Sequence, residues 1–590
     1  MQDQKNLILA IVISVVILGA YQFLYEAPRQ ENLQAERQAT AELTPSDPAS
    51  PVTAPPTGTA TAPTVTVPGG VSGSAGGTVQ AAPTKADLLQ GQRVEIENPR
   101  VVGSINLTGA RIDDLTLKDY DVDLSVDSAK ITLLSPAGAS QPYFADFGWI
   151  DIGGSKSPLP TAETQWTADR KQLTAESPVT LSWNNGQGLT FRRTFAIDQN
   201  YMITVTQRVD NNGDAPVTLR PYGLISRHGT PDTLGFFILH EGPLGVFNDT
   251  LKEVDYDDLQ EVGKHREAVQ STGGWIGYTD KNWLTALVPD QENRYDASFN
   301  YQAGEPGQLE RYQIDVLIDP VTVERGGVRE VSSRLFAGAK EVALLEAYQE
   351  SLGIDRFDLA IDWGWFPFLT HPLWVAIDYF NKLLGNFGLA IILLTVIIKF
   401  LFLPLAYKSY VSMSKMKTLQ PEMVKLRERH GDDRTKLNQE MMALYKREKV
   451  NPVSGCLPMI LQIPVFFALY KVLFVTIEMR HQPFFGWIQD LSAPDPTSVF
   501  NAFGLIPFQP PDFLLIGVWP LAMGLSMYLQ QKMNPQPPDP IQAKIFLFMP
   551  IFFTFLLARF PAGLVIYWTI NNVLTIGQQW FIMRRTRAKT

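Results

Sequence analysis

The stretch FGLAIILLTVIIKFLFLPLA, residues 387–406, decides the fold class. Its 20 residues carry one charged side chain, Lys399, and a run of that length and hydrophobicity is typical of a transmembrane helix. Four further apolar runs follow it, at 457–477, 513–529, 545–558 and 564–582. An earlier run of 18 uncharged residues, 7–24, indicates an uncleaved anchor, because its flanks fit a signal peptide poorly. The sequence therefore predicts a multi-pass α-helical membrane protein with six spans.

Charged side chains are distributed unevenly along the chain. The formal net charge is −10, which argues against a nucleic-acid-binding protein. Residues 86–360 carry 41 acidic and 24 basic side chains, whereas the 407–450 loop carries 11 Lys and Arg. The chain also ends in a basic group: Arg584, Arg585, Arg587 and Lys589. In the segment 478–512, on the other side of the predicted spans, Arg480 is the only Lys or Arg. The positive-inside rule therefore predicts an inner-membrane protein with both termini and the 407–450 loop in the cytoplasm and the acidic region in the periplasm.

The long region before the second span divides into three parts. Residues 1–26 are the predicted N-terminal anchor. Residues 27–85 are the predicted periplasmic tether, because their centre is dominated by Pro, Thr, Ala, Gly and Ser, which cannot bury enough apolar surface to fold. Residues 86–355 show short alternating runs such as RRTFAI (192–197), separated by turn signals such as NNGD (211–214). This pattern predicts a large antiparallel β-sandwich, followed by a helix at 339–352.

Helices outside the spans are expected in two places. In the 356–386 region, residues 371–385 form an amphipathic pattern whose apolar face has four members, Leu373, Ile377, Phe380 and Leu384. Such a helix fits either the headgroup plane of a bilayer or the surface of a folded domain. The 407–450 loop has two helical patterns, 409–429 and 433–449, and is predicted to form a cytoplasmic helical hairpin.

Lys399 is the most informative side chain within the predicted spans. An ionised group inside a bilayer usually faces a water-filled cavity or a partner, although a lysine this close to the cytoplasmic end can also snorkel toward the interface. Neutral polar groups occur in the same spans: Thr395 one helical turn from Lys399, Gln462 in the middle of its span, and Asn571 in the last span. A cation among neutral hydrogen-bonding groups favours a wet cavity that can receive a transient anion.

No enzyme motif is found in the sequence. GxxxxGK[ST], HExxH and GxSxG are absent, and His240-Glu241 is more typical of a strand end than of a catalytic pair. The single cysteine, Cys456, excludes an intramolecular disulfide and a CxxC metal or redox site. We therefore expect no catalytic residues, no metal ion and no cofactor.

Three strings resemble a known family. They are LQPEMVKLRERHGDD (419–433), LNQEMMALYKREKVNPVSGCLPMILQIPVFFALYKVL (437–473) and RFPAGLVIYWTINNVLTIGQQW (559–580). In order and composition they resemble the Oxa/YidC/Alb family of membrane protein insertases, over about 360–585. The anchor, tether and β domain resemble the Gram-negative form of that family.

The resemblance implies a five-helix insertase core at 387–590 and a β-supersandwich in the periplasm. It implies an insertase and folding chaperone for inner-membrane proteins, acting alone or with the Sec translocon (SecYEG and SecDF). The expected partners are nascent membrane proteins, membrane lipids and, through the hairpin and the basic C-terminus, the ribosome. In the family a hydrophilic groove carries an Arg, whose position is taken here by Lys399; Thr395, Gln462, Trp568 and Asn571 match groove-lining positions.

Two other functions are compatible with parts of the sequence. A solute transporter also needs polar groups in its spans, but transporters usually have internal repeats, and none is apparent between the first three and last three predicted spans. A membrane-tethered periplasmic sugar-processing protein would need an acid/base pair in the β domain, and it would leave the basic hairpin without a role.

Overall fold

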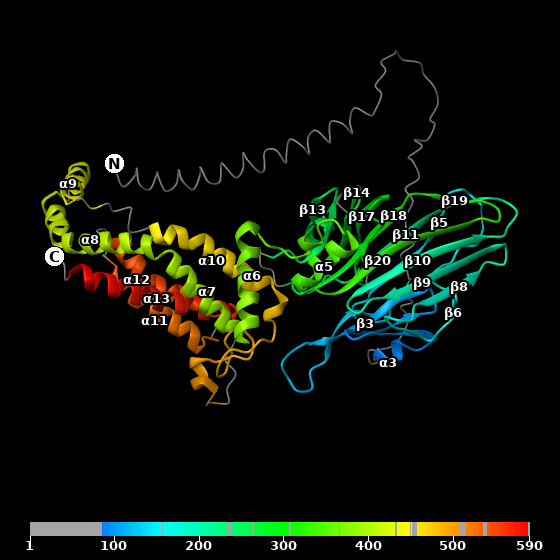
Figure 1. Cartoon of the computed structure of the whole chain (residues 1–590), viewed down its shortest axis with the longest axis horizontal. Coiled ribbons are helices and arrows are strands. Elements are labelled where there is room, and N and C mark those ends of the chain that lie inside the picture. The colour runs from blue at the N-terminus through cyan, green and yellow to red at the C-terminus, as the bar shows by residue number, and fades with distance from the viewer. Residues whose placement is uncertain are drawn as a thin grey trace, which may run out of the picture.

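The computed structural model describes residues 85–587, except for 156, 234–238, 262–264, 306–307, 365, 431–432, 449, 451–456, 505, 507–514 and 535–539. The predicted anchor at 1–26 lies outside the described residues, and so does the predicted tether at 27–85 apart from its last residue. The described chain forms a β domain followed by a helical domain (Figure 1).

The β domain consists of two sheets whose inner faces meet. The 11-stranded sheet has the order β14 (Arg266–Thr272), β17 (Arg294–Gln302), β18 (Arg311–Ile318), β11 (Val217–His228), β5 (Tyr143–Asp151), β3 (Arg111–Asp121), β2 (Val101–Asn106), β1 (Arg93–Glu97) and β7 (Gln172–Leu173), with β19 (Val321–Val323) on β11 and β4 (Lys130–Leu134) on β3. The 9-stranded sheet has the order β13 (Thr250–Glu253), β12 (Gly242–Phe247), β15 (Trp275–Thr279), β16 (Trp283–Val288), β20 (Val328–Ala339), β10 (Met202–Asn211), β9 (Leu189–Ile197), β8 (Val179–Asn184) and β6 (Thr167–Ala168). Two short helices, α3 (Lys85–Leu88) and α4 (Tyr256–Gln260), accompany them.

Strict alternation of buried and more exposed side chains is the pattern behind these strands. In β9 every second side chain is buried, as a strand with one face on a core requires. The predicted turn at 211–214 lies between β10 and β11. The predicted antiparallel sandwich is therefore confirmed, with one difference: β1 pairs with β7 in parallel. That short pair joins strands far apart in sequence, which no hairpin pattern can reveal.

Arg193 joins the two sheets from inside the core. It lies on β9 between Phe191 and Phe195 on the buried face, and only 2% of it is exposed. Its guanidinium donates to the carbonyl oxygens of Ala110 (2.8 Å) and Phe147 and lies 3.5 Å from the Asp146 carboxylate on β5. A buried charge is tolerated when it is paired and hydrogen-bonded, and here the two terminal nitrogens of the guanidinium have such partners. The cross-sheet contact thus fixes how the sheets pack.

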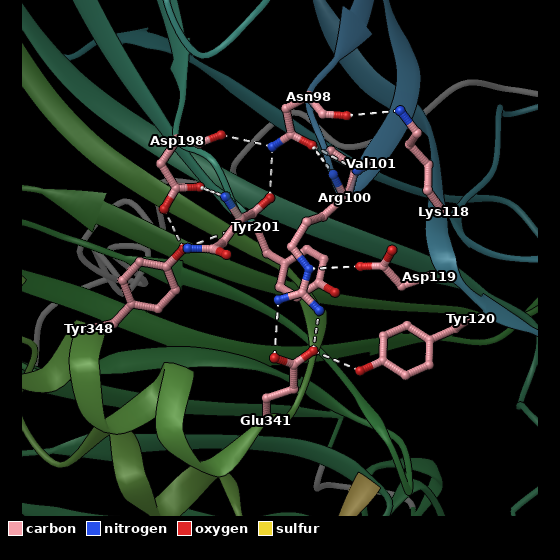
Figure 2. A network of polar contacts seen from close by, with 11 residues as sticks. Asn98, Arg100, Val101, Lys118, Asp119, Tyr120, Asp198, Tyr201, Glu341 and Tyr348 are labelled. Atoms are coloured by element: carbon pink, nitrogen blue, oxygen red, sulfur yellow. Dashed lines mark hydrogen bonds and ion pairs between the residues drawn. The ribbon is translucent and has the colours of Figure 1, made fainter. Parts of the chain in front are cut away.

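A polar network ties the first sheet to α5 (Val342–Leu352), as Figure 2 shows. The Arg100 guanidinium donates to both oxygens of Glu341, the residue preceding α5, and to Asp119 (2.8 Å). Tyr120 donates its hydroxyl to Glu341 at 2.7 Å, and the Arg100 guanidinium lies over the Tyr201 ring. The expected helix at 339–352 is present, but it begins three residues later because β20 continues through Ala339.

The helical domain follows α5 and a 3-10 turn, η2 (Phe357–Ala360). Its helices are α6 (Pro367–Leu384), α7 (Phe387–Leu401), α8 (Leu403–His430), α9 (Arg434–Arg447), α10 (Leu457–Val475), α11 (Val518–Met533), α12 (Pro540–Leu557) and α13 (Ala562–Arg587), with 3-10 turns η4 (Ile477–Met479) and η5 (Val499–Gly504). By length and composition, none of the helices in the described segments is a span on its own. Taken together, α7 and α8 are long and apolar enough for a span, and they are bent by 66° relative to each other. The count of six spans is therefore not established by the helices.

The helices begin and end at other residues than the predicted spans, because apolar runs do not mark where a helix ends. The helices α11, α12 and α13 continue through polar residues outside the predicted 513–529, 545–558 and 564–582, and α11 begins only at Val518. The predicted span 387–406 is broken at Phe402. Pro404 lacks the N–H that a continuing helix needs, but it fits the first turn of a new one, so α8 begins at Leu403. The hairpin is present as α8 and α9, with α8 longer than predicted.

The amphipathic helix α6 uses its predicted face differently. Leu373 and Ile377 are buried against the protein, and Phe380 is partly buried. Leu384, at the end of the helix, is exposed, so most of this face is packed rather than free for lipid. A second apolar stripe is exposed instead, and it consists of Phe368, Val375, Tyr379 and Leu383. The sequence pattern indicated only the first of these two faces. The side chains of Asp378 and Lys382 lie between the two faces and pair with each other at 2.6 Å.

The β domain docks on the end of α10 and the turn after it. The Lys471 ammonium on α10 lies 2.5 Å from the Asp362 carboxylate. The sequence analysis did not consider this charged residue. Glu478 on η4 accepts the Val342 N–H at the start of α5 (3.0 Å), and burial raises its pKa to about 7. Arg480 donates to the Val122 carbonyl oxygen at 3.1 Å. These contacts fix α10 relative to the β domain.

We expect Arg193→Ala to lower the free energy of unfolding of the β domain by about 3–5 kcal/mol, because it leaves Asp146 and several carbonyls buried with fewer donors. The adjacent Arg192 is the matched control. It lies on the solvent side of the same strand, paired with Asp210, so Arg192→Ala should cost about 0–1 kcal/mol. Pulse proteolysis of the full chain in urea measures both changes. Equal shifts in the two variants would show that Arg193 does not hold the sheets together.

Candidate functional site

The polar side chains predicted in the spans come from three helices of the bundle. Lys399 lies on α7, 12 residues after Phe387, and Gln462 lies on α10, 13 residues before Val475. Asn571 lies on α13, 9 residues after Ala562. At about 1.5 Å per residue, Lys399 and Gln462 are each about 18–20 Å from the helix ends nearest the β domain. The site therefore lies in the half of the bundle away from the β domain.

Lys399 is half-buried and is held by neutral groups. Its ammonium donates to the Thr575 hydroxyl oxygen at 2.8 Å and to the Gln462 side-chain oxygen at 3.3 Å. Gln578 donates to the Lys399 backbone oxygen at 3.4 Å, which adds a second hydrogen bond between α7 and α13. Within the described part of the chain, no carboxylate forms an ion pair with Lys399. Its charge is thus solvated by dipoles but not neutralised.

Gln462 links the cation to α13. Its amide nitrogen donates to the Tyr567 hydroxyl (3.1 Å) and to the Asn571 side-chain oxygen (3.3 Å). We call Lys399, Gln462, Tyr567, Asn571 and Thr575 the polar cluster. Tyr567, Thr575 and Gln578 were missed by the sequence analysis. They recur with Asn571 at spacings of three and four residues on one face of α13, which is the signal that could have revealed them.

Two expected site residues make other contacts. Thr395 is buried, and its hydroxyl donates to the Ile391 carbonyl oxygen of its own helix at 2.7 Å. Trp568 packs its ring against Phe466 on α10 and Phe553 on α12, with centroids 4.6 and 5.9 Å away. The structure thus brings Lys399, Gln462 and Asn571 together, and it places Thr395 and Trp568 next to them along α7 and α13 without hydrogen bonds to Lys399.

Polar residues on the other face of α13 hold the bundle together. Asn572 donates to the Ser526 hydroxyl on α11 at 3.0 Å, and Gln579 donates to the Asn534 side-chain oxygen at 3.0 Å. Both Asn572 and Gln579 are buried. Asn571 and Asn572 are adjacent in sequence but serve different contacts, one in the polar cluster and one in helix packing.

The chemistry of the polar cluster is that of a binding site for an anion. Its members supply one ammonium, two amides, one phenol and one hydroxyl group, and they lack a carboxylate that could act as a base. Among the residues described, no group of three or more His, Cys, Asp or Glu side chains could hold a metal ion.

In the β domain, His240 contacts Asp255 (3.3 Å) and Glu241 accepts the Lys281 N–H (3.0 Å), so these two side chains have structural partners.

Comparison with known proteins gives matches over most of the chain. A family model described as the YidC periplasmic domain matches residues 93–376, and one described as the 60Kd inner membrane protein matches residues 379–589. The membrane protein insertase YidC of Methylobacterium sp. (strain 4-46) is 50% identical over all of this chain and 96% of the relative. That of Bradyrhizobium diazoefficiens is 48% identical over all of this chain and 97% of the relative.

Solved structures give weaker matches. A crystal structure of an active YidC insertase with its first transmembrane domain resolved is 17% identical, with a TM-score of 0.35 over 83% of this chain and 92% of that chain. A galactose mutarotase related enzyme from Lactobacillus acidophilus is 11% identical, with a TM-score of 0.28 over 42% of this chain and 97% of that chain. TM-scores this low do not support a conclusion about fold or family, so family membership rests on the sequence matches.

The two matched models cover the β domain and most of the helical domain in turn. They confirm the resemblance noted in the sequence, including the division between a periplasmic domain and an inner-membrane domain. The chain belongs to the YidC family of membrane protein insertases.

Proposed function

We propose that this insertase transfers hydrophilic tails of nascent membrane proteins across the inner membrane through a polar groove lined by Lys399, Thr395, Gln462, Trp568 and Asn571. One observation carries the proposal: the Lys399 ammonium is bound by Gln462 and Thr575 and by no carboxylate of the described chain. A cation with neutral partners keeps its attraction for an incoming anion. Thr575 and Tyr567 belong to the same groove.

The energetic benefit falls on tails that carry Asp or Glu. A lone carboxylate that leaves water for hydrocarbon pays a penalty of several kcal/mol. At an effective dielectric constant of about 20, two unit charges 4 Å apart attract each other by about 4 kcal/mol before desolvation is subtracted. An ammonium also binds a carboxylate as a point charge, without the two parallel hydrogen bonds of a guanidinium, so the tail is released easily.

The orientation follows from the charge distribution. We propose that α8, α9 and both chain termini are cytoplasmic and that the β domain is periplasmic, because the basic side chains concentrate in 407–450 and at the C-terminus. In this orientation the helical hairpin and the basic C-terminus face the ribosome, and the β domain and bundle face the Sec translocon, which we propose as partners. The exposed apolar stripe of α6 then lies along the outer headgroup region.

We expect Lys399→Ala to reduce insertion of substrates with acidic tails and to spare those with uncharged tails. Lys399→Arg should retain activity because it keeps the charge. The measurement is protease protection of one substrate whose tail carries zero, one or two Asp. Lys544→Ala, which removes an exposed lysine from α12, is the matched control. Equal insertion of all three tails by Lys399→Ala and wild type would eliminate charge attraction as the mechanism.

The orientation is tested by cysteine labelling in a Cys456→Ser background. Val126 in the β domain and Thr418 on α8 are both exposed, so a cysteine at either position is accessible to reagent on its own side. A membrane-impermeant thiol reagent added to spheroplasts should label Val126→Cys and not Thr418→Cys, and lysis should allow labelling of both. Labelling of Thr418→Cys in intact spheroplasts would reverse the proposed orientation.

A further inference from the structure

The segment between α10 and α11 exposes large apolar side chains. Within 480–506, apart from residue 505, six of them are between 41% and 58% exposed: Phe485, Trp487, Val499, Phe500, Phe503 and Ile506. We call this segment the aromatic loop. Single exposed apolar residues are ordinary on a protein surface, but six within one loop form a patch that favours an apolar environment.

The acidic side chains of the aromatic loop point inward. Asp495 is 4% exposed, and its carboxylate accepts the Trp487 indole N–H (3.1 Å) and the Trp519 backbone N–H in the first turn of α11 (2.9 Å). The Asp490 carboxylate accepts the Ser492 hydroxyl at 2.7 Å. A loop in water normally places its charges outside and its rings inside. This loop has the opposite arrangement, with Trp487 exposing its ring while its N–H is satisfied from within.

The loop is held in a defined conformation. Val499 donates its N–H to Ile516 (3.1 Å), and Phe503 donates its N–H to Ser498 (2.7 Å). Ala502 and Phe503 have φ angles of 50° and 58°, which side-chain-bearing residues seldom adopt. The backbone contacts therefore hold Phe500 and Phe503 exposed, so their exposure is part of the fold.

The loop is located where the helical bundle ends on the β-domain side. Asn386, before α7, donates to the Pro483 carbonyl oxygen (3.2 Å), and Ala562, at the start of α13, donates its N–H to Ala493 (2.7 Å). α11 leaves the loop with an exposed apolar stripe of Leu521, Leu525 and Leu529, spaced four residues apart. The helix that follows the rings in sequence thus exposes an apolar stripe as well.

We infer that the aromatic loop inserts its rings into the boundary between headgroups and acyl chains of the leaflet nearest the β domain. Trp is enriched at this depth of a bilayer, and the Trp487 ring can enter it at low cost because its N–H is already hydrogen-bonded to Asp495. A lipid surface fits better than a protein partner because the chain is an inner-membrane protein whose next helix, α11, also exposes an apolar stripe. The contacts of the loop with α7 and α13 then set how deep Lys399 lies in the membrane.

The inference is tested by nitroxide depth measurements on the full chain in lipid bilayers. Single cysteines replace Phe485, Phe500 or Phe503 in the Cys456→Ser background. Leu525→Cys is the positive control on the apolar stripe, and Val126→Cys, fully exposed in the β domain, is the control in water. We expect the ratio of oxygen to nickel-chelate accessibility at the three loop positions to exceed that at Val126 several-fold.

Two outcomes would overturn the inference. A ratio at the loop equal to that at Val126 would place the rings in water, and low accessibility to both reagents would show that another protein covers them. Phe485 lies in a separate turn from the left-handed residues Ala502 and Phe503. It therefore carries the test if labelling at Phe500 or Phe503 prevents folding, and its ratio alone supports or contradicts lipid contact.

Discussion

The constraint on which the bundle depends is the solvation of one ammonium ion, that of Lys399. Hydrocarbon offers no hydrogen-bond partners, so a cation inside a bundle must obtain them from neighbouring helices or from water. Here α10 provides Gln462 and α13 provides Thr575. Those two side chains fix the positions of three helices around one charge. The other face of α13 binds α11 through Asn572, so the same helix serves the site and the packing.

α10 also connects the site to the β domain. It carries Gln462 in the polar cluster and Lys471 near its other end, where Lys471 pairs with Asp362. Glu478 follows and holds the start of α5, whose preceding residue Glu341 is bound by Arg100, next to β2 of the 11-stranded sheet. A continuous series of polar contacts thus runs from the β domain to one helix of the site. The β domain is positioned on the insertase by this series.

The sequence was sufficient for the β-sandwich and for three polar residues that the structure brings together. Alternation predicted the sandwich, and the isolated charge of Lys399 with Gln462 and Asn571 predicted a polar cluster that the structure assembles. Helix ends were predicted poorly, because α11, α12 and α13 continue through polar residues. Thr575 was missed because a threonine in an apolar helix is unremarkable until Lys399 is placed beside it. Arg193 gave no signal either, since alternation assigns a face to each position but does not identify the carbonyls that satisfy a buried guanidinium.

The most direct test of charge attraction is a reversal of both charges. Wild type and Lys399→Glu are compared on one substrate whose tail carries either two Asp or two Lys, with protease protection as the measurement. The account predicts that Lys399→Glu inserts the Lys tail better than the Asp tail, opposite to wild type, because the sign of the groove charge selects the sign of the tail. An unchanged preference for the Asp tail in Lys399→Glu would contradict it.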